Sequence, residues 1–253
     1  MASGYLGYLE YKLNIAIQGL RRVIHGSHPN TFVSHPQWVM DRQLLKFSRE
    51  ALGEVPEDAV ILDFGCGNGP YWGLRPDLIW YGADIIENER TSFIINSDGR
   101  LQAKDSLFDA ILCTQVIEHV TNLDVCFSEI FRLLKPGGIL ILNAPFLYPY
   151  HGLPHDYRRL TLNEAIKLLA DYDVVRKGHI GAFGSVIATL FNNFINDSLN
   201  KSFTLRILGV VLLPVTTLIN MTLNLLSVPL DSLDKTDSYP LNFFIIAAKP
   251  VRE

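Results

Sequence analysis

From residue 59 onward, short apolar runs alternate with helical stretches, and this alternation constrains the fold more than any other feature of the sequence. Short runs that are apolar throughout are typical of strands buried on both faces. Strands separated by helices form a mostly parallel sheet with helices on both faces. The sequence therefore predicts an α/β fold with a seven-stranded sheet, whose strands we place at 59–64, 79–84, 92–96, 108–114, 139–144, 173–180 and 243–248.

The residues before the first strand have a helical pattern. We expect one helix at 6–23 and another from Pro36, because proline is favoured in the first turn and apolar side chains follow at helical spacing. This divides the chain into N-terminal lid helices at 1–58 and a main domain at 59–253.

Composition limits the classes of function. The formal net charge is -4, so the chain lacks the basic surplus typical of nucleic-acid-binding proteins, and we expect no nucleic-acid partner. Three cysteines without regular spacing, Cys66, Cys113 and Cys126, predict neither a disulfide framework nor a metal site. They favour a reduced, cytoplasmic location.

The sharpest local signal is the segment Ile61–Gly69, in which a buried strand runs into glycines at positions 65, 67 and 69. Such a turn lets the backbone approach a ligand closely, and Asp84 at the end of the next strand can accept both hydroxyls of a ribose. The alternative is a purely structural turn. The G-x-G-x-G spacing also differs from the G-x-G-x-x-G of dinucleotide-binding proteins.

Four segments in order resemble motifs of the class I methyltransferases that depend on S-adenosyl-L-methionine (SAM), in the type 11 methyltransferase branch. They are 63–69 (motif I), 81–85 (motif II), 108–120 (the fourth-strand segment) and 129–138 (the helix and turn before the fifth strand). The resemblance implies a Rossmann-like class I methyltransferase fold and SAM as the cofactor.

The resemblance also assigns cofactor contacts to residues of this chain. The backbone of Gly65, Gly67 and Gly69 would lie against the methionine part of SAM. By the same resemblance, Asp63 would hold the ammonium directly or through water, Asp84 the ribose hydroxyls and Asp98 the adenine amine, while Gln115 would line the methionine side.

Candidate catalytic residues follow the fourth and fifth strands. His119 comes after the fourth strand, and His151 and His155 lie in the loop 145–161, which leaves the carboxyl edge of the sheet. Histidine is the usual general base near neutral pH, and a hydroxyl acceptor benefits from one. The segment resembles the "His…Pro…Asp-Tyr-x-Arg-x-Thr" segment of a bacterial methyltransferase subgroup often linked to glycans and other secondary products.

Structural roles are the alternative for these residues. His119 could simply start the next helix, and the loop could be a cap held by a salt bridge between Asp156 and Arg158. Glu118 and His119 alone are too few ligands for a metal, so we predict no metal site.

An apolar insert precedes the last strand. Residues 181–230 carry three charged side chains, and residues 207–230 carry none, which is long enough to cross a bilayer. Pro214 within this stretch, and strands of one sheet on either side of it, oppose a single crossing. We expect helices lying at the membrane surface, while a buried cap over the active site and a homodimer interface are the alternatives.

Taken together, these patterns predict a SAM-dependent methyltransferase, a cytoplasmic enzyme that is peripheral at the membrane. Its acceptor would be a small molecule, a glycan or a lipid-linked compound, with O-methylation favoured. Two other functions stay open: a nucleotide-cofactor oxidoreductase, and a non-catalytic SAM-binding protein associated with the membrane.

Overall fold

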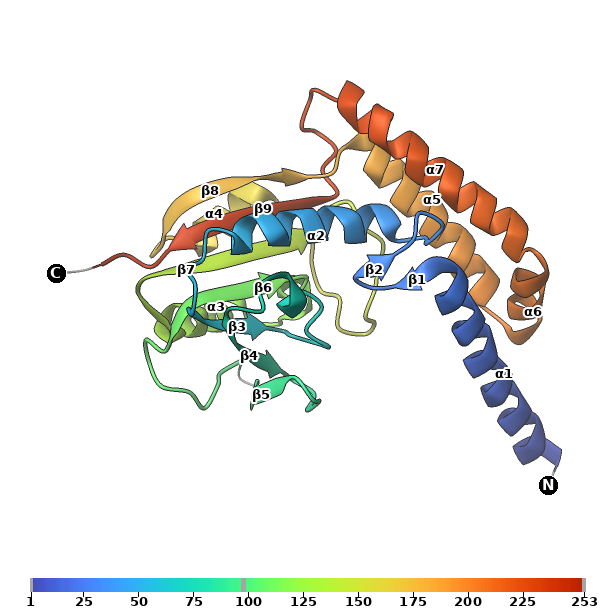
Figure 1. Ribbon diagram of the computed structural model, residues 1–253, viewed down its shortest axis with the longest axis horizontal. Coiled ribbons are helices and arrows are strands. Elements are labelled where there is room, and N and C mark those ends of the chain that lie inside the picture. Colours follow the sequence, from blue (N-terminus) through green and yellow to red (C-terminus); the bar gives the residue numbers. More distant parts are fainter. Residues whose placement is uncertain (1, 97–98, 252–253) are drawn as a thin grey trace. The chain divides into compact units, whose positions relative to one another are not determined.

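The computed structural model describes residues 2–96 and 99–251 (Figure 1). The chain forms two compact units. Residues 1–43 and 181–239 make up a helical unit, and residues 44–180 and 240–253 make up a sheet unit. The boundary at residue 43 falls inside helix α2 (Trp38–Leu52). Because the units are defined by packing, their bounds differ from the sequence-based division at residue 58.

The sheet unit contains a seven-stranded sheet in the order β5-β4-β3-β6-β7-β9-β8. Strand β9 runs antiparallel to both of its neighbours, and the other adjacent pairs are parallel. The predicted mostly parallel sheet is therefore confirmed. The strands are β3 (Val60–Phe64), β4 (Ile79–Asp84), β5 (Thr91–Ile94), β6 (Phe108–Thr114), β7 (Leu134–Pro145), β8 (Asp173–Ile180) and β9 (Asn242–Ala248).

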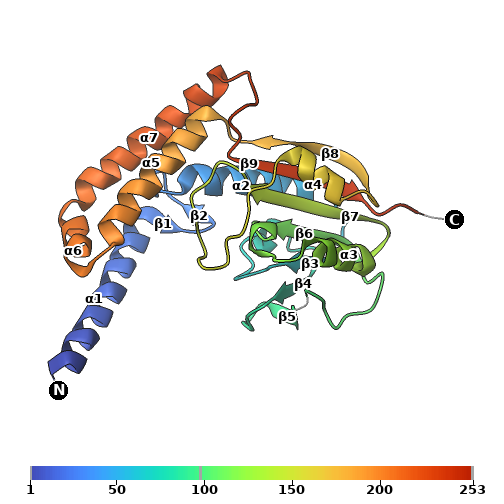
Figure 2. The same cartoon turned by 180° about the vertical axis from the view of Figure 1, so that it is seen from behind.

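Both faces of the sheet are covered, because successive side chains of a strand point to opposite faces. Ile61 and Leu112 pack in one core with Ala51 of α2. Their neighbours Leu62 and Cys113 pack in a second core with side chains of α3 (Leu123–Leu133), and α4 (Leu162–Leu168) covers the same face. Figure 2 shows α3 and α4 on the face opposite α2. Burial of each large apolar side chain contributes about 1.5–3 kcal/mol.

The strand order reverses between β3 and β6. From β3 the chain goes on to β4 and β5 on one side, and from β6 it goes on to β7 on the other. The loops that follow β3 and β6 therefore diverge at the carboxyl edge and leave a crevice there. This is where the sequence analysis places the cofactor and the candidate base.

The fifth strand is longer than predicted. Strand β7 begins at Leu134, which pairs with Phe108 of β6, whereas the sequence places a turn at 135–138 and the strand at 139–144. The predicted turn residues hydrogen-bond to the chain just after β9: the N–H of Gly137 donates to the carbonyl oxygen of Lys249 at 2.8 Å. The other strand bounds agree with the sequence-based ones to within two residues.

The helical unit consists of α1 (Ala2–His25), the short hairpin β1 (Gly26–Ser27) and β2 (Asn30–Thr31), the start of α2, and the apolar insert. The insert forms α5 (Phe183–Asn200), α6 (Phe203–Val211) and α7 (Leu213–Leu233). Helices α5 and α7 approach closely at Gly184, where a Cβ would lie 2.4 Å from the Ser227 carbonyl oxygen. Pro214 sits in the first turn of α7, where no helical hydrogen bond is lost, and the apolar stretch 207–230 is divided between α6 and α7 just before it.

Buried asparagines tie the insert to the segment after the hairpin. The Asn224 side-chain amide donates to the carbonyl oxygens of Val33 and His35, at 2.7 and 2.9 Å. Asn192 of α5 in turn donates to the Asn224 side-chain oxygen at 2.9 Å. The polar residues that dilute the apolar run are therefore interior anchors of this unit.

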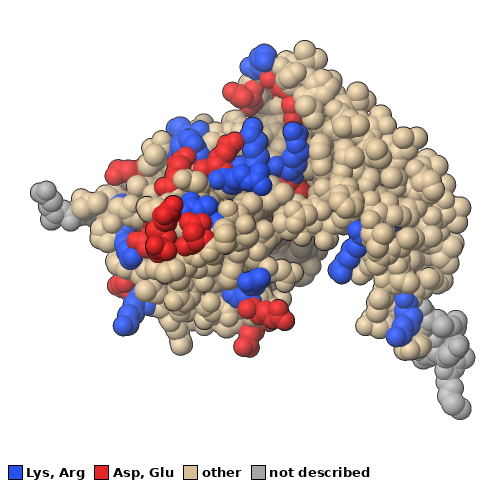
Figure 3. Space-filling model, viewed as in Figure 1, with Lys and Arg blue, Asp and Glu red and all other residues tan. Residues whose placement is uncertain are grey.

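The surface of the insert is strongly apolar. Phe194 of α5 and Leu218 of α7 are 67% and 65% exposed, and in Figure 3 the visible surface over α5, α6 and α7 is largely free of charged side chains. Among the described residues, α7 alone is long and apolar enough to cross a membrane by length and composition.

Candidate active site

A cavity of about 360 Å³ opens at the carboxyl ends of β3, β4 and β6. Its wall combines the glycine turn, the ends of the neighbouring strands and the loop after β7. The lining residues are Phe64, Gly65, Gly67, Asp84, Ile85, Ile95, Gly99, Gln115, Val116, His119, Val120, Cys126, Gly152 and His155. The wall is mostly apolar with a few polar groups, as is usual for a cofactor site.

The glycine turn requires glycine for two reasons. Gly65 and Gly67 have φ angles of +79° and +47°, which side chains rarely allow. A Cβ on Gly65 would also lie 2.3 Å from a methyl group of Val116 across the cavity wall. The turn is held to β4, because the N–H groups of Gly65 and Cys66 both donate to the carbonyl oxygen of Ala83, at 2.8 and 3.0 Å.

Asp84 lies at the end of β4 and lines the cavity. Its carboxylate accepts the N–H of Gly67 at 2.8 Å and the N–H of Ile86 at 3.2 Å. One side chain thus fixes the tip of the glycine turn and the loop after β4. The sequence places this carboxylate correctly beside the turn, and its role toward a ribose stays a prediction.

Asp63 lies behind the turn rather than in the cavity wall. It is 3% exposed, and its Oδ2 accepts a hydrogen bond from Nε1 of Trp72 at 2.9 Å. Burial raises the pKa of this carboxyl from 3.8 to about 7, and the Trp72 hydrogen bond offsets part of the rise. A neighbouring cation would favour the ionised form.

Gln115 follows β6 in a left-handed conformation, with φ of 57°. Its side-chain nitrogen donates to the side-chain oxygens of Asn143 and Asn242, at 2.6 and 3.1 Å. Both asparagines are buried and come from the adjacent strands β7 and β9. Sequence analysis identified Gln115 and missed its two supports, since nothing local marks an asparagine inside a strand as part of a site.

Gly69, the last glycine of the turn, is not among the residues that line the cavity. Gly69 closes the turn, with its N–H donating to the carbonyl oxygen of Cys66 at 2.8 Å, and its Cα packs beside the Trp72 ring. Asp98, expected at the adenine amine, falls outside the described residues.

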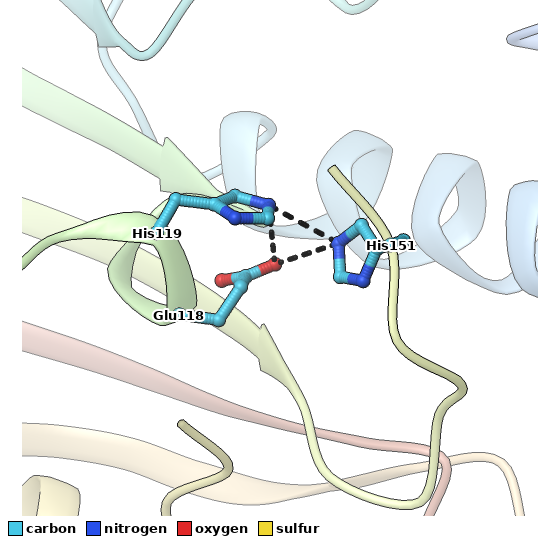
Figure 4. A group of neighbouring side chains, drawn as sticks. All are labelled: Glu118, His119 and His151. Carbon is cyan, nitrogen blue, oxygen red and sulfur yellow. Dashed lines mark hydrogen bonds and ion pairs between the residues drawn. The ribbon is translucent and has the colours of Figure 1, made fainter. Parts of the chain in front are cut away.

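Three side chains converge at the cavity edge: Glu118, His119 and His151 (Figure 4). Glu118 and His119 lie in the 3₁₀ turn Ile117–His119 after β6, and His151 comes from the loop after β7. The Nε2 atoms of the two histidines are 3.2 Å apart. Oε1 of Glu118 lies 3.5 Å from Nε2 of His151 and 3.8 Å from Nε2 of His119.

The carboxylate of Glu118 is the feature of this cluster that the sequence did not reveal. It is 2% exposed, and neither of its oxygens has a hydrogen-bond partner of normal geometry among the residues described. A buried carboxylate without partners is costly unless a cation or a proton lies beside it. The two imidazoles are positioned to hold that proton, and Glu118 accordingly raises the pKa of His151.

Hydrogen bonds orient His119 toward the cavity. Its Nδ1 lies 2.7 Å from the carbonyl oxygen of His155, which can only accept, so Nδ1 carries the proton and Nε2 has a free lone pair. His155 thus contributes its backbone to the orientation of His119, while its ring contacts the Tyr157 hydroxyl at 2.8 Å. All three predicted catalytic histidines therefore lie together.

The loop that carries His151 is held by a different salt bridge from the one expected. Asp156 pairs with Arg159 at 2.5 and 2.8 Å, and the pKa of its carboxyl is lowered to about 2 by that arginine. Arg158 instead donates to the carbonyl oxygen of Thr121. Arg159 also donates to the Pro149 carbonyl oxygen at 2.9 Å, so it connects the two ends of the loop. Asp156 in turn accepts the N–H of His151 at 2.9 Å.

The same cluster could hold a metal ion. One ligand atom from each of Glu118, His119 and His151 lies within 4.8 Å of the others. Two imidazoles and a carboxylate are a ligand set that divalent transition metals accept. The sequence-based expectation of no metal site rested on spacing, which does not register contacts made by a distant loop, and it stays a prediction.

Comparison with known proteins adds independent information. The profile described as "Methyltransferase domain" matches residues 38–186. A ubiquinone biosynthesis O-methyltransferase of Bartonella bacilliformis is 28% identical over 220 residues, which cover 73% of this chain and 83% of that protein.

Other relatives match over shorter stretches. A tRNA (carboxymethyluridine(34)-5-O)-methyltransferase of Arabidopsis thaliana is 31% identical over 103 residues, or 37% of this chain. The match covers only 26% of that protein. Among solved structures, the 4+2 cyclase SpnF has a TM-score of 0.56 at 18% identity, covering 84% of this chain and 82% of that chain. At that identity the likeness shows the fold alone.

Proposed function

The chain belongs to the methyltransferase domain family and is a SAM-dependent enzyme, and from this premise we propose that it methylates a hydroxyl oxygen of its acceptor. The acceptor class is a small molecule, a glycan or a lipid-linked compound. The observation that carries the proposal is the pair of imidazoles beside a buried carboxylate at the edge of the cavity. The length and coverage of the match to the ubiquinone biosynthesis O-methyltransferase support it.

In the proposed cofactor site, the residues of the cavity take the roles that the resemblance gave them. Asp84 receives the ribose hydroxyls while its contact with Gly67 keeps the turn in place. Asp63 lies behind the turn and outside the cavity wall, and it holds the amino group of SAM through water, ionised when the ammonium is near. Gln115 lies beside the methionine part. The apolar side chains of Ile85 and Ile95 suit the flat face of adenine.

The reaction is an in-line displacement. The acceptor oxygen forms a bond to the methyl carbon, the bond from that carbon to the sulfonium sulfur breaks, and S-adenosylhomocysteine leaves. The hydroxyl proton passes to Nε2 of His119, which lies 3.2 Å from Nε2 of His151. Glu118 lies beside both Nε2 atoms and raises the pKa of His151, which favours the uptake of a proton at this place. A positioned base of this kind contributes about 10²–10⁴-fold to the rate.

The experiment is methyl transfer from SAM labelled in its methyl group. Purified protein is incubated with separate acceptor fractions of soluble metabolites, lipids and total tRNA. We expect alkali-stable label in the metabolite or lipid fraction, and at least a tenfold loss with His119→Ala. His179→Ala, which changes an exposed histidine of β8, serves as the matched control.

Two results would overturn the proposal. Label in the tRNA fraction alone would make the acceptor a nucleic acid, as in the shorter match to the plant enzyme. Label on nitrogen, or equal turnover of the His119→Ala and His179→Ala variants, would remove the base-assisted hydroxyl chemistry.

We also propose that the helical unit contacts a membrane peripherally, on the cytoplasmic side. Support comes from the exposed apolar side chains of α5 and α7. Intact protein should float with vesicles of mixed zwitterionic and anionic lipids, and Phe194→Lys should reduce the floated fraction. No flotation, together with a dimer in light scattering that Phe194→Lys dissociates, would assign the surface to a second copy of the chain.

A further inference from the structure

The helical unit has a cavity of its own, about 270 Å³ in volume and formed by the end of α1, the segment after the hairpin, α5 and α7. It is several times larger than the roughly 30 Å³ that a water molecule occupies in the liquid. Every lining residue belongs to the helical unit, so the cavity does not depend on how the two units are arranged. Nothing in the proposed methyl transfer uses it.

The cavity is positively charged. Arg21 and Arg22 line it, and none of its described lining residues is Asp or Glu. The Arg21 guanidinium is half-buried, and its hydrogen-bond partners among the described residues are neutral: the side-chain oxygens of Asn196 and Asn200, at 3.5 and 3.1 Å. Burial lowers the pKa of Arg21, and because both of these partners are neutral, its charge is not balanced by a carboxylate among the described residues. An anion in the cavity would provide that compensation.

The two histidines of the cavity have fixed tautomers. The Ser34 hydroxyl donates to the Ile24 carbonyl oxygen at 3.1 Å and therefore accepts from Nδ1 of His25 at 3.0 Å. Nδ1 of His35 accepts the N–H of Gln37 at 3.0 Å, so in the neutral ring the proton is on Nε2. Burial lowers the pKa of both rings, which keeps them neutral near pH 7. The cavity thus offers both an N–H donor and a nitrogen acceptor.

Two buried asparagines leave their carbonyl oxygens unpartnered. The Asn220 amide nitrogen donates to the Ser34 carbonyl oxygen at 3.1 Å, and that of Asn192 donates to Asn224 at 2.9 Å. These bonds fix which end of each amide is oxygen. Asn192 and Asn220 are 0% and 4% exposed, both line the cavity, and neither Oδ1 has a donor among the residues described. Buried acceptors of this kind require a donor, which only a ligand or water can supply here.

We propose that this cavity binds a phosphorylated polyol, either as a free sugar phosphate or cyclitol phosphate or as a lipid headgroup. Arginine matches the oxygens of a phosphate and forms charge-assisted hydrogen bonds with them. Hydroxyl groups donate to the Asn192 and Asn220 oxygens, which a fully ionised phosphate does not. The ligand must therefore carry both kinds of group.

The test is calorimetric titration of the full chain with inorganic phosphate and with myo-inositol 1-phosphate, alongside sedimentation with phosphatidylcholine vesicles that contain or lack phosphatidylinositol. We expect the cyclitol phosphate to bind at least tenfold more tightly than inorganic phosphate. Arg21→Gln and the more exposed Arg22→Gln should each weaken binding about tenfold or more. Arg206→Gln is the control, because it removes the same charge from the same unit but outside the cavity.

The titration and the vesicle sedimentation together distinguish a free ligand from a lipid headgroup. Tight binding of the soluble cyclitol phosphate supports a free ligand, and binding only to the phosphatidylinositol vesicles supports a headgroup. Equal affinity for inorganic phosphate and the cyclitol phosphate would overturn the role of the asparagine oxygens. Failure of every probe, or binding that Arg21→Gln and Arg22→Gln leave unchanged relative to Arg206→Gln, would overturn the site.

Discussion

Replacing Asp63 by Asn should change how the stability of the protein depends on pH. The carboxyl is buried, and its pKa is raised from 3.8 to about 7, so the folded state favours the protonated acid. The stabilisation from this group is fully present below pH 3.8, decreases as pH rises, and is lost above about pH 7. Asn keeps the shape and can still accept the Trp72 hydrogen bond, but it has no proton to lose.

The size of the effect follows from the two pKa values. At about 1.4 kcal/mol per pH unit, ionising Asp63 costs the folded state roughly 4 kcal/mol above pH 7. From about pH 5 to about pH 8, the free energy of unfolding of the wild type should therefore fall by roughly 3 kcal/mol relative to Asp63→Asn. Urea denaturation of both proteins without cofactor measures this difference, with Asp173→Asn, an exposed change at the start of β8, as the control.

Measuring S-adenosylhomocysteine binding at different pH values connects this effect to the cofactor. If Asp63 holds the ammonium, S-adenosylhomocysteine should bind more tightly as pH rises through about 7, and Asp63→Asn should lose both affinity and that pH dependence. The reasoning is refuted if wild type and Asp63→Asn differ by a constant amount, within about 0.5 kcal/mol, across the whole pH range.

Three further predictions concern the cavity and the histidine cluster. Asp84→Ala should weaken S-adenosylhomocysteine binding at least tenfold in calorimetry, because it removes the acceptor of the Gly67 N–H and the carboxylate that we propose for the ribose; affinity equal to that of Asp173→Asn would contradict this. Turnover should fall at acid pH, because the histidine cluster takes up a proton there. Since Glu118 raises the pKa of His151, Glu118→Gln should shift this acid-side fall in turnover to lower pH. An unchanged pH profile would exclude an effect of Glu118 on the base. EDTA should leave turnover unchanged, whereas loss of activity that zinc or manganese restores would make the cluster a metal centre and remove its role as a base.

The sequence predicted the sheet well because its information is local. A run such as 108–114 is apolar at nearly every position, and only a strand buried on both faces satisfies it. The glycine turn and Asp84 were also predictable, because each follows a strand directly and the carboxyl ends of parallel strands share one edge.

The histidine cluster and the two supports of Gln115 were harder to predict from the sequence. His119 and His151 are 32 positions apart, and their contact depends on the path of a loop that is fixed by Asp156 and Arg159. Gln115 and Asn242 are separated by 127 positions. Neither distance appears in a local pattern. Asn220 and Asn224 of α7 look in the sequence like polar residues that dilute an apolar run, because periodicity does not show that their side chains donate to backbone carbonyls.

The position of β9 has a consequence for how the protein is made. This strand lies between β7 and β8 and is their shared partner, yet it is the last strand of the sheet to leave the ribosome. Until residues 242–248 emerge, β8 has no neighbour in the sheet and Gln115 lacks one of its two acceptors. The helices of residues 183–233 are synthesised in that interval, when the residues that line the cofactor cavity have been made but Gln115 still lacks Asn242. A nascent chain therefore acquires its apolar surface before it acquires a finished catalytic site.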